Sequence, residues 1–227
     1  MIDILFLAYN RREFTDAALK ALVANTSWSN VRRTWLYDDG STDGTLELLR
    51  SYESADTILV QTELRSPVAI TNDFLTHRDP APVFAKIDND TMVCPGWLEQ
   101  CLDVMDRYPE IDLLGIEPMY PCEGLDRVEP RGIELADTIG GIGLMRTRAF
   151  TSLPVPDGRM GFTGWQSRNS QVKKAWINPA LPVFLLNRLP IEPWATLSAT
   201  YVQKGWQRAW PGPYRPGREK LWSWWDP

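Results

Sequence analysis

Residues 83–90, VFAKIDND, set the expected architecture, because an apolar run leads in this stretch directly to two carboxylates. Side chains alternate along a strand, so a strand that ends here presents Asp88 and Asp90 on the same side of the backbone. Two close carboxylates repel each other unless a positive charge lies between them, and hard oxygen ligands suit Mg²⁺ or Mn²⁺. The stretch therefore predicts a divalent-cation site at the tip of a buried strand, although the two acids alone could also cap a turn.

A second acidic turn, YDDGSTDG at residues 37–44, follows another apolar run about fifty residues earlier. Asp, Ser, Thr and Gly are common turn and helix-cap residues, and Asp43 is interpreted as one of these. Asp39 is interpreted as more than a turn former. Together the two acidic turns indicate a nucleoside-diphosphate site at the carboxyl ends of adjacent strands.

The hydrophobic pattern of the first half alternates between strand-like and helix-like segments. Strands are predicted at 2–9, 33–37, 58–60 and 83–87, and helices at 12–25, 43–52 and 67–77. Strands that alternate with helices pair in parallel, so the expected fold is α/β, a three-layer α/β/α sandwich around a mostly parallel central sheet. Ligands of such sheets bind beyond the carboxyl ends of the strands, where both acidic turns fall.

The second half of the chain is organised differently. Helices are expected at 97–107 and 164–176, strands at 113–116, 139–145 and 182–186, and a loop rich in Pro, Gly and charge at 119–132. From residue 203 onward, tryptophans are interleaved with lysine and arginine. We therefore divide the chain into a main domain at 1–190 and a Trp/Arg-rich extension at 191–227 that docks on it.

Composition excludes several classes of protein. A chain of 227 residues, 44% of them hydrophobic, can form one large core, and its net charge of −5 argues against a surface wholly devoted to nucleic acid. No apolar run reaches the length of a membrane span. The three cysteines form no metal or disulfide pattern and the sequence has no basic leader, so we expect a cytoplasmic protein. We also expect a monomer or weak dimer. The single histidine, His77, excludes mechanisms that need several imidazoles.

Six segments carry a family resemblance, namely FLAYNR at 6–11, YDDGSTDGT at 37–45, the helix that contains Asn72, KIDNDTMV at 86–93, PGWL at 95–98 and IGGIGLMR at 139–146. Their order, over roughly residues 2–190, resembles the family 2 glycosyltransferases, which have the GT-A fold. The resemblance implies an enzyme that transfers a sugar from a nucleoside-diphosphate sugar, above all a UDP-sugar, to an acceptor hydroxyl. It also implies Mn²⁺ or Mg²⁺ as the cofactor.

The resemblance further implies roles for individual residues. Those that it assigns to the nucleotide are Ala8, Tyr9, Asn10, Arg11, Asp38, Asp39, Arg65, Lys86, Asp88 and Asn89. Asp39 would accept a hydrogen bond from the uracil imide, since a carboxylate cannot donate and so prefers uracil or guanine over cytosine. Asp90 would ligate the metal that bridges the two phosphates, and Asp88 would face the ribose or a metal-bound water. The family usually has Pro where Ala8 stands.

Two departures from the family pattern concern the base and the metal. Inverting members carry a Glu-Asp pair near residues 161–166, where this chain reads GFTGWQ. Asp157 and Asp137 are therefore candidates for the general base that takes the proton of the acceptor hydroxyl, unless the enzyme retains configuration and needs no such base. Many relatives place a histidine ligand after the late strand, where Asn187 here offers a neutral oxygen and Arg188 a positive charge near the diphosphate.

The tail and the acceptor leave alternatives open. Trp206 and Trp210, interleaved with Lys204 and Arg208, could stack on bases and neutralise phosphates, or this segment could dock back on the sheet. Small glycosyltransferases of this build also resemble bacteriophage enzymes that glucosylate hydroxymethylated pyrimidines in DNA. The expected acceptor is therefore a hydroxyl of DNA, of a glycan or of a small molecule.

Two other functions compete with this interpretation. A sugar-1-phosphate nucleotidyltransferase on a similar sheet would have a Gly-rich, Arg-containing loop after its first strand, whereas this chain reads AYNRR at 8–12. A non-catalytic nucleic-acid-binding module would depend on the basic tail, and changes at Asp88 and Asp90 would leave its function intact.

Overall fold

The computed structural model describes residues 1–79, 81–116, 131–150, 161–178, 181, 183–188 and 192–206. Its first half alternates strands and helices as the pattern predicts. The elements are β1 (Ile2–Ala8), α1 (Arg12–Asn25), η1 (Trp28–Asn30), β2 (Val31–Asp38), α2 (Thr45–Arg50), β3 (Thr57–Gln61), α3 (Pro67–His77) and β4 (Val83–Asp88).

The second half contributes shorter strands and the helices α4, α5 and α6. The elements are β5 (Thr91–Met92), α4 (Trp97–Arg107), β6 (Leu113–Gly115), β7 (Gly132–Leu135), β8 (Gly143–Arg146), η2 (Thr147–Phe150), α5 (Gly161–Arg168), β9 (Lys174–Asn178), β10 (Phe184–Leu185), η3 (Leu186–Arg188) and α6 (Trp194–Gln203).

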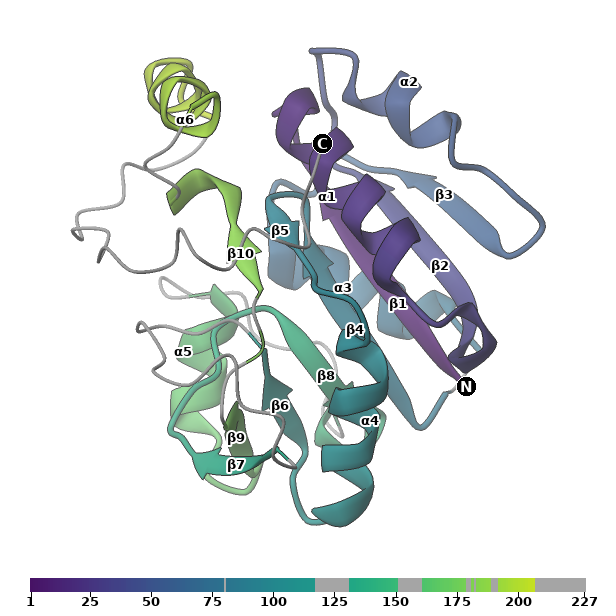
Figure 1. The fold of residues 1–227 in the computed structure, drawn as a ribbon, viewed down its shortest axis with the longest axis vertical. Coiled ribbons are helices and arrows are strands. Elements are labelled where there is room, and N and C mark those ends of the chain that lie inside the picture. The colour runs from purple at the N-terminus through teal and green to yellow at the C-terminus, as the bar shows by residue number, and fades with distance from the viewer. Residues whose placement is uncertain are drawn as a thin grey trace.

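One mixed sheet organises these elements in the order β3-β2-β1-β4-β8-β6-β9-β7 (Figure 1). Its first four strands are parallel to one another, as are β6 and β9. β8 runs antiparallel to both β4 and β6, and β7 runs antiparallel to β9. β5 and β10 form a separate antiparallel pair. The α/β class and the mostly parallel central sheet are confirmed.

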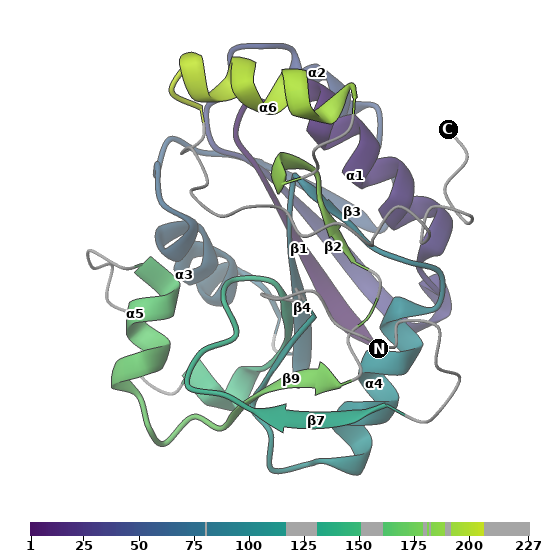
Figure 2. The ribbon, with the colours of Figure 1, turned by 60° about the vertical axis from the view of Figure 1, so that its left-hand side comes forward.

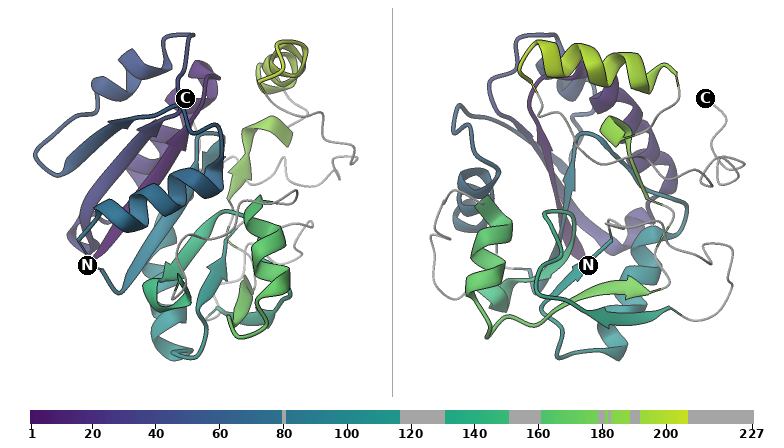
Figure 3. Two further views of the ribbon diagram at one scale, coloured as in Figure 1. Left: turned by 180° about the vertical axis from the view of Figure 1, so that it is seen from behind. Right: turned by 90° about the vertical axis from the view of Figure 1, so that its left-hand side faces the viewer.

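Two apolar layers hold the helices on the sheet. Because side chains alternate along β1, Ile4 and Phe6 face the layer of α1 and α4, and Leu5 and Leu7 face the layer of α3 and α5. Figure 1 shows α1 and α4 in front of the sheet, and the view from behind in Figure 3 shows α3 and α5 in front of it. The molecule therefore has the three layers expected of an α/β/α sandwich.

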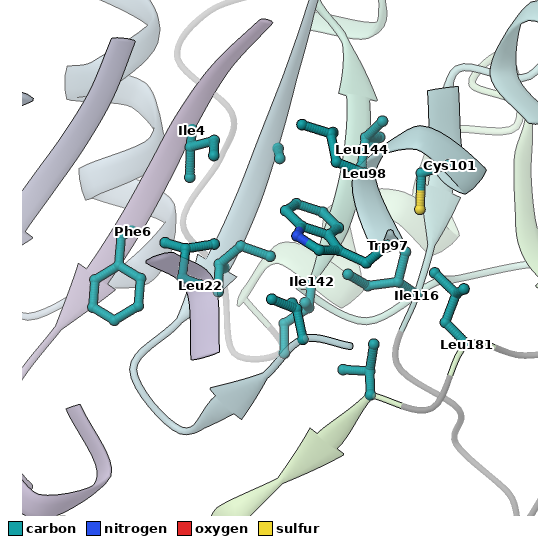
Figure 4. Packing of buried hydrophobic residues seen from close by; sticks show 14 of the residues in the cluster. Ile4, Phe6, Leu22, Trp97, Leu98, Cys101, Ile116, Ile142, Leu144 and Leu181 are labelled. Carbon is teal, nitrogen blue, oxygen red and sulfur yellow. The ribbon is translucent and has the colours of Figure 1, made fainter. Parts of the chain in front are cut away.

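Trp97 is the largest fully buried side chain in the core between the sheet and helices α1 and α4, and Figure 4 shows it between Leu22, Leu98 and Ile142. Its indole N–H donates to the hydroxyl of Thr26 at 3.0 Å, so the polar atom of this ring is satisfied inside the core. Burying an apolar side chain of this size contributes about 3 kcal/mol or more. This packing fixes α4, and with it the preceding turn that carries Asp90.

Local signals set the boundaries of α3. Ser66 accepts a hydrogen bond from the N–H of Ala69, and Pro67 occupies the first helical position, where no N–H is needed. The helices expected at 12–25, 67–77 and 97–107 are confirmed with those bounds.

The helix predicted at 164–176 is wrong in its second half. α5 ends at Arg168, and the segment from Lys174 to Asn178 forms β9 instead. The N–H of Lys173 donates to Asp112 at 3.0 Å, which leads the chain into pairing with β6 and β7 on either side. Pairing with neighbouring strands therefore overrides the helix-like spacing of Trp165, Val172 and Trp176.

The strand predicted at 139–145 is shorter than expected, because residues 140–141 form a turn and β8 begins at Gly143. Gly143 has φ of +150°, and a Cβ there would lie 2.1 Å from the carbonyl oxygen of Leu114. The glycine therefore permits the close approach of the backbone of β6. The late strand predicted at 182–186 is reduced to β10.

The end of the described chain returns to the carboxyl edge of the sheet. α6, which the sequence did not predict, lies across the end of α1 in Figure 2. The rings of Phe14 and Tyr201 meet edge-on with centroids 5.0 Å apart, and Trp194 lies 5.9 Å from Phe14. The Tyr201 hydroxyl also donates to Glu13. None of the described helices is long and apolar enough to span a membrane.

Candidate active site

The strand register brings the two acidic turns to one edge of the sheet. Ala8 pairs with Asp38 across β1 and β2, and Leu7 pairs with Asp88 across β1 and β4. Because these strands are parallel, their carboxyl ends and the loops that follow lie side by side. The edge that the sequence predicted for ligand binding is therefore assembled from three neighbouring strands.

A pocket of about 340 Å³ opens at this edge. Its walls come from the loop after β1, the turn after β2, the start of α3, the tip of β4 and the end of the α6 segment. The lining residues are Leu7, Ala8, Tyr9, Arg11, Asp39, Arg65, Pro67, Ile70, Asp88, Asn89 and Trp206. Seven of them belong to the set that the resemblance assigned to the nucleotide, namely Ala8, Tyr9, Arg11, Asp39, Arg65, Asp88 and Asn89.

Asn10 connects the two acidic turns beneath this pocket. Its N–H donates to the Ser41 hydroxyl at 2.8 Å, and its side-chain oxygen accepts from the N–H of Thr42 at 2.7 Å. Its carbonyl oxygen accepts from Asn89 Nδ2 at 2.9 Å. Asn10 is buried with φ of +51°, a left-handed conformation that Asn tolerates better than most residues. It therefore positions both turns without lining the pocket.

Asp39, Arg65 and Tyr9 form one connected group on the pocket wall. Asp39 Oδ1 accepts hydrogen bonds from the N–H of Arg65 and from the Thr62 hydroxyl, both at 3.0 Å. No hydrogen bond from the described residues reaches Asp39 Oδ2. The Arg65 guanidinium lies 4.7 Å from the centre of the Tyr9 ring. An open carboxylate oxygen beside an aromatic ring and a planar cation suits a nucleobase with an N–H donor.

The other two acids of the first turn have supporting positions. Asp38 is buried and accepts from the N–H of Ser41 at 3.1 Å, and it does not line the pocket. Asp43 accepts from the N–H of Arg12 at 2.9 Å and from that of Thr45 at 3.1 Å, at the starts of α1 and α2. An anion is stabilised at helix amino termini, so Asp43 supports the starts of both helices as a turn residue, although the N-cap position of α2 is Gly44.

Lys86 and Asp88 form an ion pair at the tip of β4. The Lys86 ammonium lies 2.5 Å from Asp88 Oδ1, and the two residues share a face because they are two apart on a strand. Asp88 lines the pocket, whereas Lys86 is buried and does not. Lys86 therefore neutralises Asp88 from behind and lies outside the set of residues that can contact a ligand directly.

Asp90 lies in a different position from the one expected. β4 ends at Asp88, and Asn89 and Asp90 form a turn, so the alternation of a strand does not place Asp90 beside Asp88. Asp90 Oδ2 accepts from Arg11 Nη1 and from Asn187 Nδ2, both at 2.8 Å. Asp90 does not line the pocket, whereas Arg11 does. Arg11 therefore lies between this carboxylate and the pocket.

Asn187 leaves a buried acceptor beside Asp90. Its Oδ1 is buried and has no hydrogen-bond partner in the described part of the chain. η3 holds Asn187 in place, since the N–H of Leu186 donates to the carbonyl oxygen of Asp90 at 2.8 Å. Over the described residues, no group of three or more His, Cys, Asp and Glu side chains gathers around one point. A cation here would have to combine Asp88, Asp90 and an amide oxygen with ligands from the substrate.

The candidates for a general base lie apart from the described pocket. Asp137 is exposed and does not line the pocket, and Asp157 falls outside the described residues. Gln166 occupies the region where relatives have acids, and it is buried with both ends of its amide engaged. Its Oε1 accepts from the N–H of Ile139 at 2.8 Å, and its Nε2 donates to Gly140 at 2.6 Å. Gln166 thus holds the glycine turn that packs on Lys86.

Four lining residues were not assigned to the site from the sequence, namely Leu7, Pro67, Ile70 and Trp206, and Trp206 is the most distant of them along the chain. The backbone N–H of Trp206 donates to the carbonyl oxygen of Tyr201 at 2.9 Å, and the centres of the two rings lie 5.7 Å apart. The Lys204 ammonium lies 4.4 Å from the centre of the Trp206 ring. The composition change at residue 203 was the available signal, but it does not specify where the segment docks. Trp194 and Tyr201 of α6 pack on Phe14 of α1, and residues 207–227 lie outside the described part.

This α/β/α fold, with a pocket at the carboxyl edge of its sheet, is the one expected from the resemblance to glycosyltransferases of the GT-A type. The sequence model described as Glycosyl transferase family 2 matches residues 3–140, which is more than half of the chain, and the chain belongs to this family. A comparison with curated protein sequences gives no significant match.

Solved structures of glycosyltransferases have the same fold. The structure of S. aureus TarS 1-349 in complex with UDP-GlcNAc is 18% identical with a TM-score of 0.58, over 77% of this chain and 57% of that one. Another TarS 1-349 structure is 15% identical with a TM-score of 0.56, and the chain spans 60% of its length. GalNAc-T7 with UDP, GalNAc and Mn²⁺ is 11% identical with a TM-score of 0.58, over 78% of this chain and 41% of that one. At these identities the likeness shows the fold alone.

Proposed function

We propose that this glycosyltransferase uses a uridine-diphosphate sugar as donor and a divalent cation, Mn²⁺ or Mg²⁺, as cofactor. The observation that carries the proposal is the convergence of Asp39, Asp88 and Arg11 from three strand ends on one pocket. The volume of that pocket, about 340 Å³, is in the range of small-molecule sites. The UDP-bound relatives named above support the choice of nucleotide.

Uridine is proposed because of the hydrogen-bonding capacity of Asp39. Its Oδ1 is held by Thr62 and Arg65, so Oδ2 is the oxygen available to an incoming N–H. A carboxylate accepts the imide N–H of uracil and offers nothing to the ring nitrogen of cytosine, which is an acceptor. Tyr9 and the guanidinium of Arg65 provide flat surfaces on which the base can stack.

The residues near Asp90 fit a hard cation in donor type. Asp88 keeps an oxygen that takes no hydrogen bond from the described residues, and Asn187 Oδ1 is a buried acceptor without a partner there. We assign Asp88, Asp90 and Asn187 as the residues that would hold Mn²⁺ or Mg²⁺, since these ions prefer oxygen ligands. When bound, the cation supplies positive charge to the departing diphosphate.

The rest of the transfer depends on groups of the chain itself. Arg11 lines the pocket and can bind phosphate oxygens in a bidentate manner, and Asn89 positions the loop that carries Arg11. Asp157 and Asp137 stay the proposed general bases for an inverting reaction, and a retaining reaction would need neither. Analysis of the anomeric configuration of the product by NMR distinguishes these two reactions.

For the acceptor we propose a hydroxyl of hydroxymethylated pyrimidine in DNA, with a glycan or a small alcohol as the alternative. We also propose that the chain functions as a main domain at 1–190 and an extension at 191–227. Two residues of the extension support this acceptor, because Trp206 lines the pocket and the Lys204 ammonium lies 4.4 Å from the centre of its ring. Transfer of radiolabelled sugar to hydroxymethylated DNA, compared with unmodified DNA and with free sugars, tests the assignment.

A thermal-shift panel tests the donor without knowledge of the acceptor. Nucleotide sugars of uridine, guanosine, cytidine and adenosine are added with and without Mn²⁺, and a ligand that binds the folded state raises the melting temperature by mass action. We expect the largest shift for a UDP-sugar with Mn²⁺, and none for cytidine donors. Equal shifts for all bases would contradict the role of Asp39, and no shift for any nucleotide would contradict the donor assignment.

A further inference from the structure

The ion pair between Arg11 and Asp90 separates the proposed metal ligand from the pocket. Arg11 Nη1 lies 2.8 Å from Asp90 Oδ2, with the two side chains only 14% and 9% exposed. A second nitrogen of the same guanidinium donates to Asn89. The positive charge next to Asp90 is therefore supplied by the chain itself.

We propose that Arg11 is a built-in counter-ion that competes with the divalent cation for Asp90 and moves to the diphosphate when the cation binds. The proposal rests on the donor and metal assignments made above. It makes Arg11 a residue that couples the binding of the cation to the binding of the nucleotide.

Charge and burial explain why the two cations exclude each other. A carboxylate as buried as Asp90 is stable only with a positive partner, which Arg11 provides in the absence of metal. A divalent cation bound to the same oxygen would meet the guanidinium within hydrogen-bonding distance, and like charges that close repel strongly. Binding the cation therefore requires Arg11 to leave, and this requirement lowers the affinity for the free cation.

The position of Arg11 also determines where it can go. Its backbone is fixed, since its carbonyl oxygen accepts from the N–H of Thr15 in α1 at 2.9 Å, and its φ is +63°. Its side chain lines the pocket, so a guanidinium released from Asp90 is already beside the space for the ligand. Lys86, the partner of Asp88, is buried outside the pocket and cannot make the same move.

The experiment measures the affinity of the full chain for Mn²⁺, by electron paramagnetic resonance, with and without UDP. We compare the unchanged protein with Arg11→Gln, which removes the charge, and with Arg12→Gln, in which an exposed neighbour outside the pocket is changed. Without UDP, Arg11→Gln should bind Mn²⁺ about 5-fold to 150-fold more tightly, the usual range of coupling between sites. Arg12→Gln should bind as the unchanged protein does.

UDP should tighten Mn²⁺ binding by different amounts in the two proteins. In the unchanged protein UDP should tighten Mn²⁺ binding strongly, because the diphosphate accepts the displaced guanidinium. In Arg11→Gln this gain in Mn²⁺ affinity should be smaller, because no guanidinium is left to bind the diphosphate. A loss of packing alone would weaken Mn²⁺ binding, so the direction of the change separates competition from a structural role.

Two further measurements keep the result interpretable. Without Mn²⁺, Arg11→Gln should melt at a lower temperature than the unchanged protein. Addition of Mn²⁺ should raise the melting temperature of Arg11→Gln more than that of the unchanged protein, because the metal restores a partner for Asp90. If Arg11→Gln does not fold, Arg11→Lys keeps a charge without the planar fork and should bind Mn²⁺ more tightly than the unchanged protein, though by a smaller factor.

The outcomes separate this inference from the proposed function. Equal or weaker Mn²⁺ binding by the folded Arg11 variants, with normal Mn²⁺ and UDP binding by the unchanged protein, would overturn the competition and leave the donor and metal assignments standing. An unchanged protein that binds no Mn²⁺ even with UDP would overturn both.

Discussion

Replacing Asp90 by alanine tests the ion pair that dominates the site. The substitution removes the acceptor of Arg11 Nη1 and of Asn187 Nδ2, each 2.8 Å away, and leaves a guanidinium that is only 14% exposed without its carboxylate. Removing one partner of a buried pair costs about 3 to 5 kcal/mol, since the other charge stays buried without compensation. We therefore expect Asp90→Ala to lower the free energy of unfolding by about 3 kcal/mol.

Asp103→Ala is the matched control for this change. Asp103 pairs with Arg107 at a similar distance, 2.7 Å, but these side chains are 63% and 38% exposed. An exposed pair four residues apart on a helix contributes about 0.3 to 0.5 kcal/mol, because water screens it. The two aspartates thus differ in burial while sharing the chemistry and the length of the interaction.

Urea unfolding monitored by tryptophan fluorescence measures both variants. The midpoint should fall several times further for Asp90→Ala than for Asp103→Ala, with an unchanged slope. Replacing both partners, Arg11→Met with Asp90→Leu, should recover part of the loss, as apolar pairs of similar volume often do. Equal losses for the two aspartates would refute the argument, because burial would then have no bearing on the energy of the pair.

Three further predictions concern the pocket and the core. Trp206→Ala should weaken binding of UDP by about tenfold or more, as expected when a stacking ring is lost. Trp194→Ala, at the start of α6 and outside the pocket, should leave this affinity unchanged, and equal calorimetric affinities for both variants would exclude Trp206 as a ligand contact. Asp39→Asn should reduce the preference for uridine over cytidine donors in the thermal-shift panel, because an amide can also donate, and a retained preference would contradict base recognition by Asp39. Burial raises the pKa of the Cys94 thiol from 9.0 to about 12, so this thiol should resist alkylation at pH 8 until the protein unfolds. The contribution of Cys94 to the free energy of unfolding should fall as pH rises from about 9 towards 12, because the unfolded state loses this proton first. Rapid labelling of Cys94 in the native protein, mapped by mass spectrometry, would contradict this prediction.

Local sequence signals predicted the first half of the fold well. α3 begins with a proline after a capping serine, and the alternation of β1 separates the two core layers, so each boundary depends on neighbours in the chain. β9 and α6 were missed for the opposite reason. Their structure depends on pairing with β6 and β7 and on packing against Phe14, which the local pattern does not contain.

In the candidate site, too, some features follow from the local sequence and others depend on the fold. The two acidic turns were predicted from apolar runs that end in aspartates, and the register of β1 with β2 and β4 brings them together. The partner of Asp90 was not predictable in this way, because Arg11 lies 79 residues earlier and reaches it only through the folded loop. An arginine in a loop gives no indication of which carboxylate it will neutralise.

The contact of Tyr201 with Glu13 has a consequence for synthesis on the ribosome. Its partners are separated by 188 residues, which take about 10 to 40 s to translate at typical rates. Throughout that interval a nascent chain contains the residues of β1 and α1 but lacks Tyr201 and the pocket residue Trp206. The proposed nucleotide site is therefore complete only late in synthesis, after α6 and Trp206 have emerged from the exit tunnel.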